Sequence, residues 1–152
     1  MNYSRREVGL MLPTLAASLR GTEPLHATES AAAAPESPAL PSKAFKYEDL
    51  PVKVNGQNKS RAVLDGQTHS GFPVELHMTE LGPGQAPHPP HHHVHEEILM
   101  LRTGALDVTI SGQTTRVTAG SVVCVASNVE HGWKNPGAEP AEYFVVALGQ
   151  KA

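Results

Sequence analysis

Short apolar runs separated by turn residues follow one another along the chain from Phe45 to its end. The clearest case is residues 105–120, where apolar and polar residues alternate on both sides of Ser111-Gly112. Alternation with a period of two predicts strands with one buried face, and the Ser-Gly pair predicts a tight turn between them. This segment is therefore expected to form a β-hairpin.

Other runs predict further strands, at residues 61–67, 72–81, 98–104 and 141–149. Asp65-Gly66 in the first run is a hairpin signal. Residues 121–127 are largely apolar and β-branched, which predicts a strand buried on both faces, with Cys124 as a small buried hydrophobe. Nothing after Phe45 favours a helix, so the expected fold class is all-β, a sandwich or barrel spanning residues 45–149.

The N-terminal residues 1–27 have the order of an export signal. Arg5-Arg6 precedes an apolar run from Val8 to Leu19, and small residues near Ala27 offer a cleavage site. The segment resembles a twin-arginine signal, which implies a periplasmic or secreted protein that folds, and can acquire a metal, before export. The alternative is an ordinary amphipathic helix. Residues 28–44, rich in Ala, Pro, Ser and Glu, are expected to form a flexible linker.

Charge and cysteine content narrow the classes of partner. Net charge is −3 over 152 residues, and no run of Lys or Arg exceeds two, so nucleic acid is not an expected partner. Without residues 1–27 the chain has 12 − 3 = 9 basic and 15 − 2 = 13 acidic residues, which disfavours binding to anionic membranes. The single cysteine excludes an intrachain disulfide.

The segment HPPHHHVHEE, residues 88–97, concentrates the candidate chemistry. It could be a metal site, a histidine-rich low-complexity patch or a solvated loop. Imidazole and carboxylate together suit borderline divalent metals, and residues two apart on a strand project to the same side. His91 and His93 with Glu97 fit this pattern, and so do His93 and His95 with Glu97. Spacing alone does not decide between the two sets.

The residues around this cluster resemble the two motifs of the cupin family, over residues 72–148. The first motif, H-x-H, E and a later G, fits His91, His93, Glu97 and Gly104. The second fits Gly120, His131 and Asn135, with Ala126 and Asn128 in place of the usual Pro and Gly. Those two positions shape a turn, and Asn tolerates the left-handed conformation that Gly would supply.

The resemblance implies a small single-domain cupin, a jelly-roll (double-stranded β-helix) barrel that holds one divalent metal ion: Mn, Fe, Ni, Cu or Zn. It implies His91, His93, Glu97 and His131 as ligands and assigns no catalytic side chain. The remaining candidates are expected to have supporting, structural or surface roles: His88, His92, His95 and Glu96. Glu75 and His77 share a strand face and are candidates for lining the cavity. Trp133 is expected to pack as an aromatic or to wall the pocket.

Three classes of function remain open at this stage. The first is a metal-dependent enzyme, dioxygenase-like, with isomerase, lyase or hydrolase chemistry as alternatives. Its substrate would be a small molecule with two oxygen donors for the two open coordination positions of a six-coordinate ion. The second is a periplasmic cupin that binds a small ligand or sugar without turnover, and the third is a metal-sequestering protein. The family resemblance also implies a homodimer.

Overall fold

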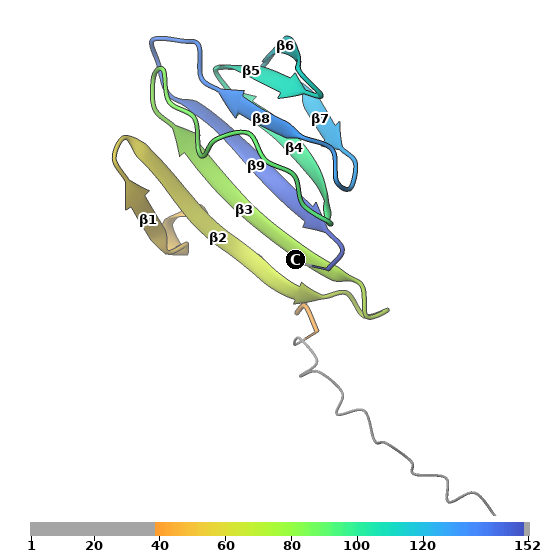
Figure 1. Ribbon diagram of the computed structural model, residues 1–152. Coiled ribbons are helices and arrows are strands. Elements are labelled where there is room, and N and C mark those ends of the chain that lie inside the picture. The colour runs from red at the N-terminus through yellow and green to blue at the C-terminus, as the bar shows by residue number, and fades with distance from the viewer. Residues whose placement is uncertain (1–38, 151–152) are drawn as a thin grey trace, which may run out of the picture. The chain divides into compact units, whose positions relative to one another are not determined.

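The computed structural model describes residues 39–150, which form one all-β unit (Figure 1). The predicted export signal and most of the predicted linker lie outside the described residues. The elements are η1 (Tyr47–Asp49), β1 (Val52–Asn55), β2 (Asn58–Gln67), β3 (Pro73–Leu81), β4 (Glu96–Thr103), β5 (Ala105–Ile110), β6 (Gln113–Thr118), β7 (Val122–Val125), β8 (His131–Lys134) and β9 (Ala141–Leu148). The all-β prediction is confirmed, since the helical content described is one short 3-10 turn. No helix among the described residues is long and apolar enough to cross a membrane.

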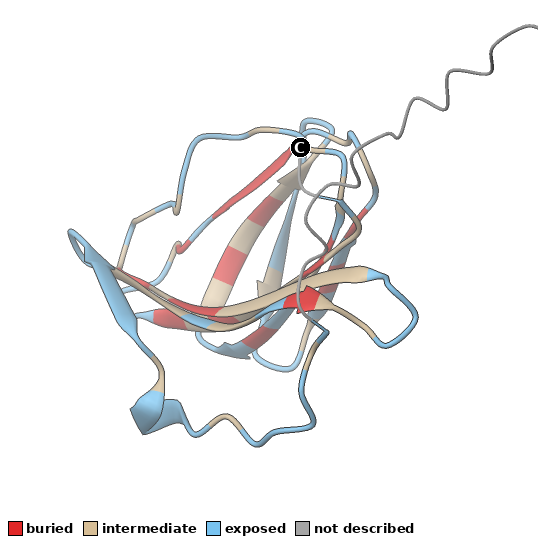
Figure 2. Cartoon of the chain, turned by 90° about the horizontal axis from the view of Figure 1, so that it is seen from below, coloured by how far each residue is buried: buried red, intermediate tan, exposed pale blue. Residues whose placement is uncertain are grey.

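The strands form two antiparallel sheets. The larger has the order β1-β2-β3-β9-β4-β7 and the smaller the order β6-β5-β8. Buried residues lie along the central strands, while the connecting loops are mostly exposed (Figure 2). The largest fully buried side chains include Leu81, Leu99, Leu106 and Tyr143, contributed by β3, β4, β5 and β9. Both sheets therefore contribute to one apolar core, which is the main source of stability for a domain of this size.

The predicted hairpin at residues 105–120 is confirmed. β5 and β6 pair up to Ile110 and Gln113, and the turn between them is Ser111-Gly112. Ser111 and Gly112 have φ values of 48° and 78°. Positive φ at both central residues is the geometry of the two-residue turn whose twist matches antiparallel strands.

The hairpin signal at Asp65-Gly66 was wrong. Both residues lie inside β2, paired with Glu75 and Val74 of β3. The chain turns later, where the backbone N–H of Phe72 donates to Thr68 Oγ1 at 3.0 Å. Gly71, with φ of 80°, supplies the left-handed residue of this turn. The side-chain acceptor of Thr68 and this second glycine outweigh the Asp-Gly signal.

The prediction that residues 121–127 form a fully buried strand was also wrong. β7 pairs only with β4 and is an edge strand of the larger sheet. Its side chains alternate, with Val123 and Val125 buried and Val122 and Cys124 exposed. Because all four residues are apolar, the sequence carries no alternation that would reveal the solvent face.

Two strands had no sequence prediction, and both matter for the site. β8 carries His131 and Trp133 and is buried except for its last residue. β1 is exposed throughout and pairs with β2 at the other edge of the larger sheet. Each has four residues, which is too short for a periodic pattern to stand out.

Candidate metal centre

The candidate site forms where the loop before β4 crosses the start of β8. The backbones of His91 and His131 pair as an antiparallel bridge, with N–O distances of 3.0 and 2.9 Å. Glu97, in β4, faces the same space from the larger sheet. The larger sheet and the β8 strand of the smaller sheet thus both contribute to the site.

Residues 91–97 alternate in exposure, although most of them precede β4. His91, His93 and His95 are partly buried and Glu97 is buried, whereas the intervening His92 is exposed. His92 therefore points away from its neighbours, in agreement with the sequence analysis. The alternation extends past His93, and so brings His95 to the inner side as well.

The structure brings together all four side chains predicted as ligands. Donor atoms of His91, His93 and His131 lie within 4.8 Å of one another. Each carboxylate oxygen of Glu97 lies near a different histidine. Oε1 is 3.4 Å from His93 Nε2, and Oε2 is 3.3 Å from His131 Nε2. Three imidazoles and one carboxylate therefore converge on one region, as a mononuclear divalent site requires.

Backbone carbonyls orient two of these imidazoles. His93 Nδ1 lies 2.8 Å from the carbonyl oxygen of His95, and His131 Nδ1 lies 2.8 Å from that of Val129. Because a carbonyl only accepts hydrogen bonds, each Nδ1 carries the proton and donates it. The Nε2 atom of each ring then keeps a free lone pair, which faces Glu97 and is available to a metal.

Several buried nitrogen and oxygen atoms that could ligate a metal have no hydrogen-bond partner, and they mark the place where a cation fits. Among the described residues these atoms are His91 Nδ1, His93 Nε2, His95 Nδ1, Glu97 Oε2 and His131 Nε2. A buried polar atom with no partner costs on the order of 1–3 kcal/mol, and all four side chains predicted as ligands contribute such an atom. A divalent ion would satisfy lone pairs on imidazole nitrogens and a carboxylate oxygen together, and this donor set suits Mn, Fe, Ni, Cu or Zn.

His95 lies closer to the site than the sequence analysis expected. Its ring stacks on that of His93, with centroids 3.6 Å apart and an angle of 8° between planes. Its Nε2 is 3.7 Å from Glu97 Oε1, and His93, His95 and Glu97 form a second group with metal-ligating atoms close together. The supporting role predicted for His95 is thus a direct contact with the carboxylate. The i, i+2 spacing from His93 was the signal for it.

The surroundings favour the neutral form of two imidazoles, those of His91 and His95. Burial lowers the pKa of His91, and the neighbouring His88, His131 and His93 lower it further. Burial also lowers the pKa of His95, with His93 adding to the effect, while Glu97 opposes both shifts. At His91 and His95, protons therefore compete less strongly with a metal for the ring nitrogens than they would at an ordinary histidine.

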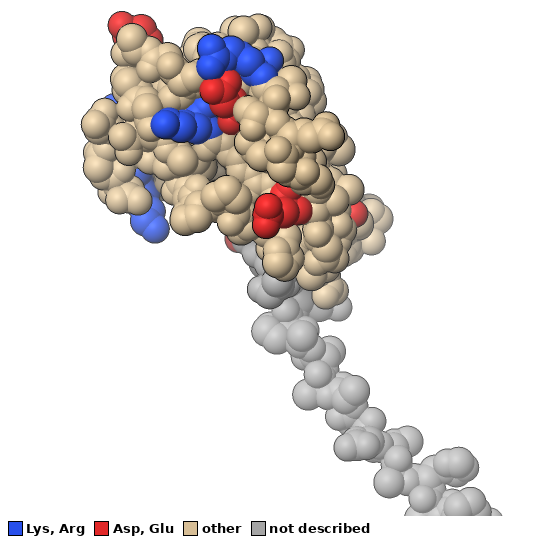
Figure 3. All heavy atoms as spheres, turned by 45° about the horizontal axis from the view of Figure 1, so that its top comes forward, with Lys and Arg blue, Asp and Glu red and all other residues tan. Residues whose placement is uncertain are grey.

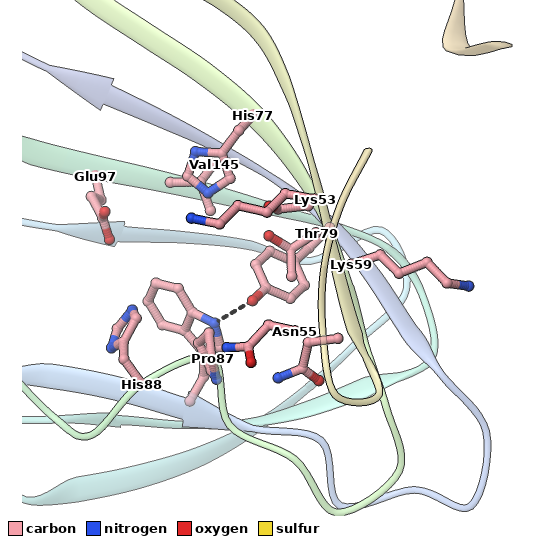
Figure 4. Close-up of a pocket in the computed structure, with 13 residues that line it drawn as sticks. Lys53, Asn55, Lys59, His77, Thr79, Pro87, His88, Glu97 and Val145 are labelled. Carbon is pink, nitrogen blue, oxygen red and sulfur yellow. Dashed lines mark hydrogen bonds between the residues drawn. The ribbon is translucent and has the colours of Figure 1, made fainter. Parts of the chain in front are cut away.

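A cavity of about 290 Å³ opens beside Glu97 (Figure 4). Its lining comes from β1, β2, β3, β4, β8, β9 and the loop before β4, and consists of Lys53, Asn55, Asn58, Lys59, Ser60, His77, Thr79, Pro87, His88, Glu97, Trp133, Tyr143 and Val145. Of the two strand residues proposed to line it, His77 does so, and Glu75 lies 3.4 Å from His77 Nδ1. The volume suits a small molecule rather than a polymer segment.

Trp133 has both roles considered for it. The side chain is buried in the core and also lines the cavity. Its Nε1 donates a hydrogen bond of 2.8 Å to the hydroxyl of Tyr143, drawn as the dashed line in Figure 4. Burial raises the pKa of Tyr143 to about 12. The two aromatic residues therefore form a rigid, neutral wall beside the metal cluster.

The second-motif residues that are not ligands hold the local backbone. Asn135 is fully buried, and its Nδ2 donates to the carbonyl oxygens of Leu81 and Glu139 at 2.9 and 2.8 Å. Asn128 adopts a φ of 60°, the left-handed conformation expected where the family pattern has Gly. These contacts fix the turn before His131 and the end of β8, and so position the last ligand.

Sequence reasoning missed the residues that β1 brings to the cavity. Lys53 and Asn55 line the cavity from this short, exposed edge strand. The signal that could have found this strand is Gly56, which has a φ of 60° and opens the two-residue turn between β1 and β2.

Comparison with known proteins identifies the fold. Residues 77–147 match the family model for the cupin domain. No curated protein matches the sequence significantly. Among solved structures, an RmlC-like cupin from Shewanella frigidimarina has 20% identity and a TM-score of 0.59, covering 72% of this chain and 93% of its own.

Two further solved structures with a similar fold belong to named proteins. The polyketide cyclase RemF from Streptomyces resistomycificus has 18% identity and a TM-score of 0.61, covering 72% of this chain and 80% of its own. KdgF from Halomonas sp. has 15% identity and a TM-score of 0.61, covering 72% of this chain and 96% of its own. At these identities the likeness is one of fold. Residues 77–147 therefore match the cupin domain model, and the described residues have the cupin jelly-roll fold.

Proposed function

We propose that this protein binds one divalent transition-metal ion through His91, His93, Glu97 and His131. We propose further that it is an enzyme, which uses this ion to act on a small oxygen-rich substrate. The observation that carries the proposal is the cluster of buried donor atoms without partners, which converges beside a cavity. Three neutral imidazoles and one carboxylate would give a bound divalent ion a net charge of +1. A six-coordinate ion would keep about two positions for other ligands.

The chain's own residues supply the surfaces that would bind a substrate. Trp133 and Tyr143 line one side of the cavity with aromatic surface. The polar residues His77 and Thr79 offer hydrogen bonds to a bound molecule from β3. A divalent ion held by the four ligands would supply Lewis-acid or redox chemistry. A substrate with two adjacent oxygen donors fits this arrangement.

The reaction class that we propose is dioxygenase-like. Two open positions and a cavity shielded by aromatic side chains suit a reaction that needs both a bound organic anion and a small gas. The polyketide cyclase with the same fold supports an enzyme acting on an oxygen-rich organic molecule. A fold alone does not identify a reaction, so the proposal depends on the ligand set and the cavity.

Two measurements test the proposal in sequence. Elemental analysis of protein purified from its native host should find one equivalent of a transition metal, and metal-free protein would contradict the site. Oxygen consumption by the loaded protein against catechols, flavonols and β-diketones then tests the reaction. Tight binding of such compounds without oxygen consumption or product would instead favour a non-catalytic binding protein.

We also propose that the protein is exported by a twin-arginine route. The support is the order of Arg5-Arg6, the apolar run and the small residues near Ala27. Mass spectrometry of the protein from the periplasm should show a chain that begins after the apolar run. Recovery of the full-length chain from the cytosol alone would contradict export.

A further inference from the structure

The cavity wall contributed by β1 and the start of β2 lies outside the segment matched by the cupin family model. That match begins at His77, in β3. The wall therefore lies in a part of the molecule that the family match does not cover. It contains Lys53, Asn55, Asn58, Lys59 and Ser60, of which two are cationic and none is anionic.

The two lysines point in different directions. Lys59 extends away from the cavity in Figure 4 and forms an ion pair of 2.7 Å with Glu80. Lys53 extends from β1 toward the side of the cavity where His77 and Glu97 lie. Within the described part of the chain, no carboxylate pairs with Lys53.

Of the two lysines that line the cavity, Lys53 is the one without a carboxylate partner among the described residues. On the face shown in Figure 3, some but not all Lys and Arg side chains lie close to Asp and Glu side chains. Pairs of this kind include Arg102 with Glu142 at 3.0 Å and Arg116 with Asp107 at 2.7 Å. Lys53 lacks such a partner, so its charge remains available to a ligand that enters the cavity.

The negative charge that lines the cavity comes from a proposed metal ligand. Glu97 is the one carboxylate among the lining residues, and it faces His93 and His131. With a cation bound there, the cavity would have positive charge both at the metal and at Lys53. Such a cavity favours an anion over a neutral molecule of the same shape.

We infer that the ligand of this cavity is a small carboxylic acid that carries, apart from its carboxylate, a pair of adjacent oxygen donors. The donors would take the open positions at the metal, and the carboxylate would accept hydrogen bonds from Lys53. Trp133 and Tyr143 provide a flat apolar wall for the body of the molecule. This inference rests on the proposed metal site and adds the charge of the ligand to it.

The test compares two ligands that present the same oxygen donors to a metal. Comenate, 5-hydroxy-4-oxopyran-2-carboxylate, carries a carboxylate where kojic acid carries a neutral hydroxymethyl group. Isothermal titration of Zn²⁺-loaded protein gives a preference ratio, the Kd of kojic acid divided by that of comenate. The ratio in the wild type should fall about 10-fold in the Lys53→Met variant, the size expected for one charge-assisted hydrogen bond near the surface.

Two controls make the ratio specific to Lys53. Lys46→Met removes a lysine that does not line this cavity, and should leave the ratio unchanged. Comparing ratios between variants also cancels any intrinsic difference in how the two ligands bind zinc. Raising the ionic strength should reduce the preference in the wild type and have little effect in Lys53→Met, because the lysine is exposed to solvent.

Each outcome has a distinct meaning. An unchanged ratio in Lys53→Met, or no binding of either ligand to protein that retains its zinc, would overturn the inference and leave the metal site standing. Failure of the wild type to retain zinc or any other divalent transition metal, measured separately by elemental analysis, would overturn the metal site and the inference together. Circular dichroism and thermal unfolding check that β1 remains in place in both lysine variants.

Discussion

His91 and His131 are joined through their backbones, each donating its N–H to the carbonyl oxygen of the other, at 3.0 and 2.9 Å. Two of the four proposed ligands are therefore brought together by strand pairing rather than by the metal. Their separation in sequence is bridged by the same hydrogen bonds that attach the loop before β4 to β8. The site is part of the fold before any ion arrives.

Removal of the metal should consequently leave the fold intact. A chelator is expected to lower the thermal unfolding temperature while the far-ultraviolet circular dichroism spectrum at 25 °C stays the same. Metal at about 100 times its Kd would stabilise the protein by about 2.7 kcal/mol. Loss of β-structure on chelation would mean that the metal organises the barrel, contrary to the backbone pairing.

Replacing any one proposed ligand should reduce metal occupancy. The variants are His91→Ala, His93→Ala, Glu97→Gln and His131→Ala, measured by elemental analysis after dialysis. His92→Ala is the matched control, because His92 is exposed and points away from its neighbours. An equal loss of metal in His92→Ala and His93→Ala would show that the ligand register is wrong.

His95→Ala should weaken metal binding without abolishing it. The side chain contacts Glu97 Oε1 and stacks on His93, so its removal leaves two ligands less well oriented. Loss of an orienting partner typically lowers metal affinity about 10–100-fold. Competition with a chromophoric chelator would measure the change, and an affinity equal to that of His92→Ala would remove His95 from the site.

Gly104 should be far less tolerant of substitution than Gly112. Both have positive φ, at 79° and 78°, so the backbone strain that Ala would introduce is similar at the two positions. A Cβ at Gly104 would lie 2.9 Å from Ala141 Cα, whereas one at Gly112 meets nothing within 4 Å. Chemical denaturation should show Gly104→Ala to be the less stable variant by about 1–3 kcal/mol. Equal losses would mean that β9 moves aside freely.

Tyr143 should make the protein sensitive to high pH. Its pKa is raised to about 12 by burial, above the ordinary value of 10.0, so the unfolded chain loses this proton at lower pH than the folded one. Below pH 10 the tyrosine is protonated in both states, and its full contribution to the free energy of unfolding is present. As pH rises toward 12 the free energy of unfolding falls by up to about 3 kcal/mol, because the unfolded chain ionises first.

The matched variant for this effect is Tyr143→Phe. It should be less stable at neutral pH, because Trp133 Nε1 loses its hydrogen-bond acceptor. Its free energy of unfolding should nevertheless fall less steeply than that of the wild type between pH 10 and 12. Parallel slopes for the two proteins would show that the hydroxyl ionises as readily in the folded state as in the unfolded chain.

Sequence reasoning reached the fold class because the strand signals were mutually consistent. Alternation in residues 105–118 and the Ser111-Gly112 turn are local features, and the structure follows them. The same reasoning failed at Cys124, where apolar residues on both faces hide which one is exposed. Whether β7 has one neighbour or two depends on distant strands, which a local pattern does not contain.

The candidate ligands could be chosen from motif spacing, but their surroundings could not. The inward position of His95 follows from alternation continuing through a segment that is mostly not a strand. Lys53 reaches the cavity because β1 folds back along β2 across the two-residue turn Gly56-Gln57. Glycine at the first position of such a turn is a hairpin signal, so this strand could have been predicted, but its place beside the cavity could not.

Trp133 gives the protein a built-in optical reporter. It is the only tryptophan in the sequence, and its ring lies 5.7 Å from that of His131. Light absorbed by this indole is emitted from a buried position between the proposed ligand and the hydroxyl of Tyr143. Arrival of a paramagnetic ion such as Cu²⁺ should quench that emission, so that occupancy can be followed without any label attached to the chain.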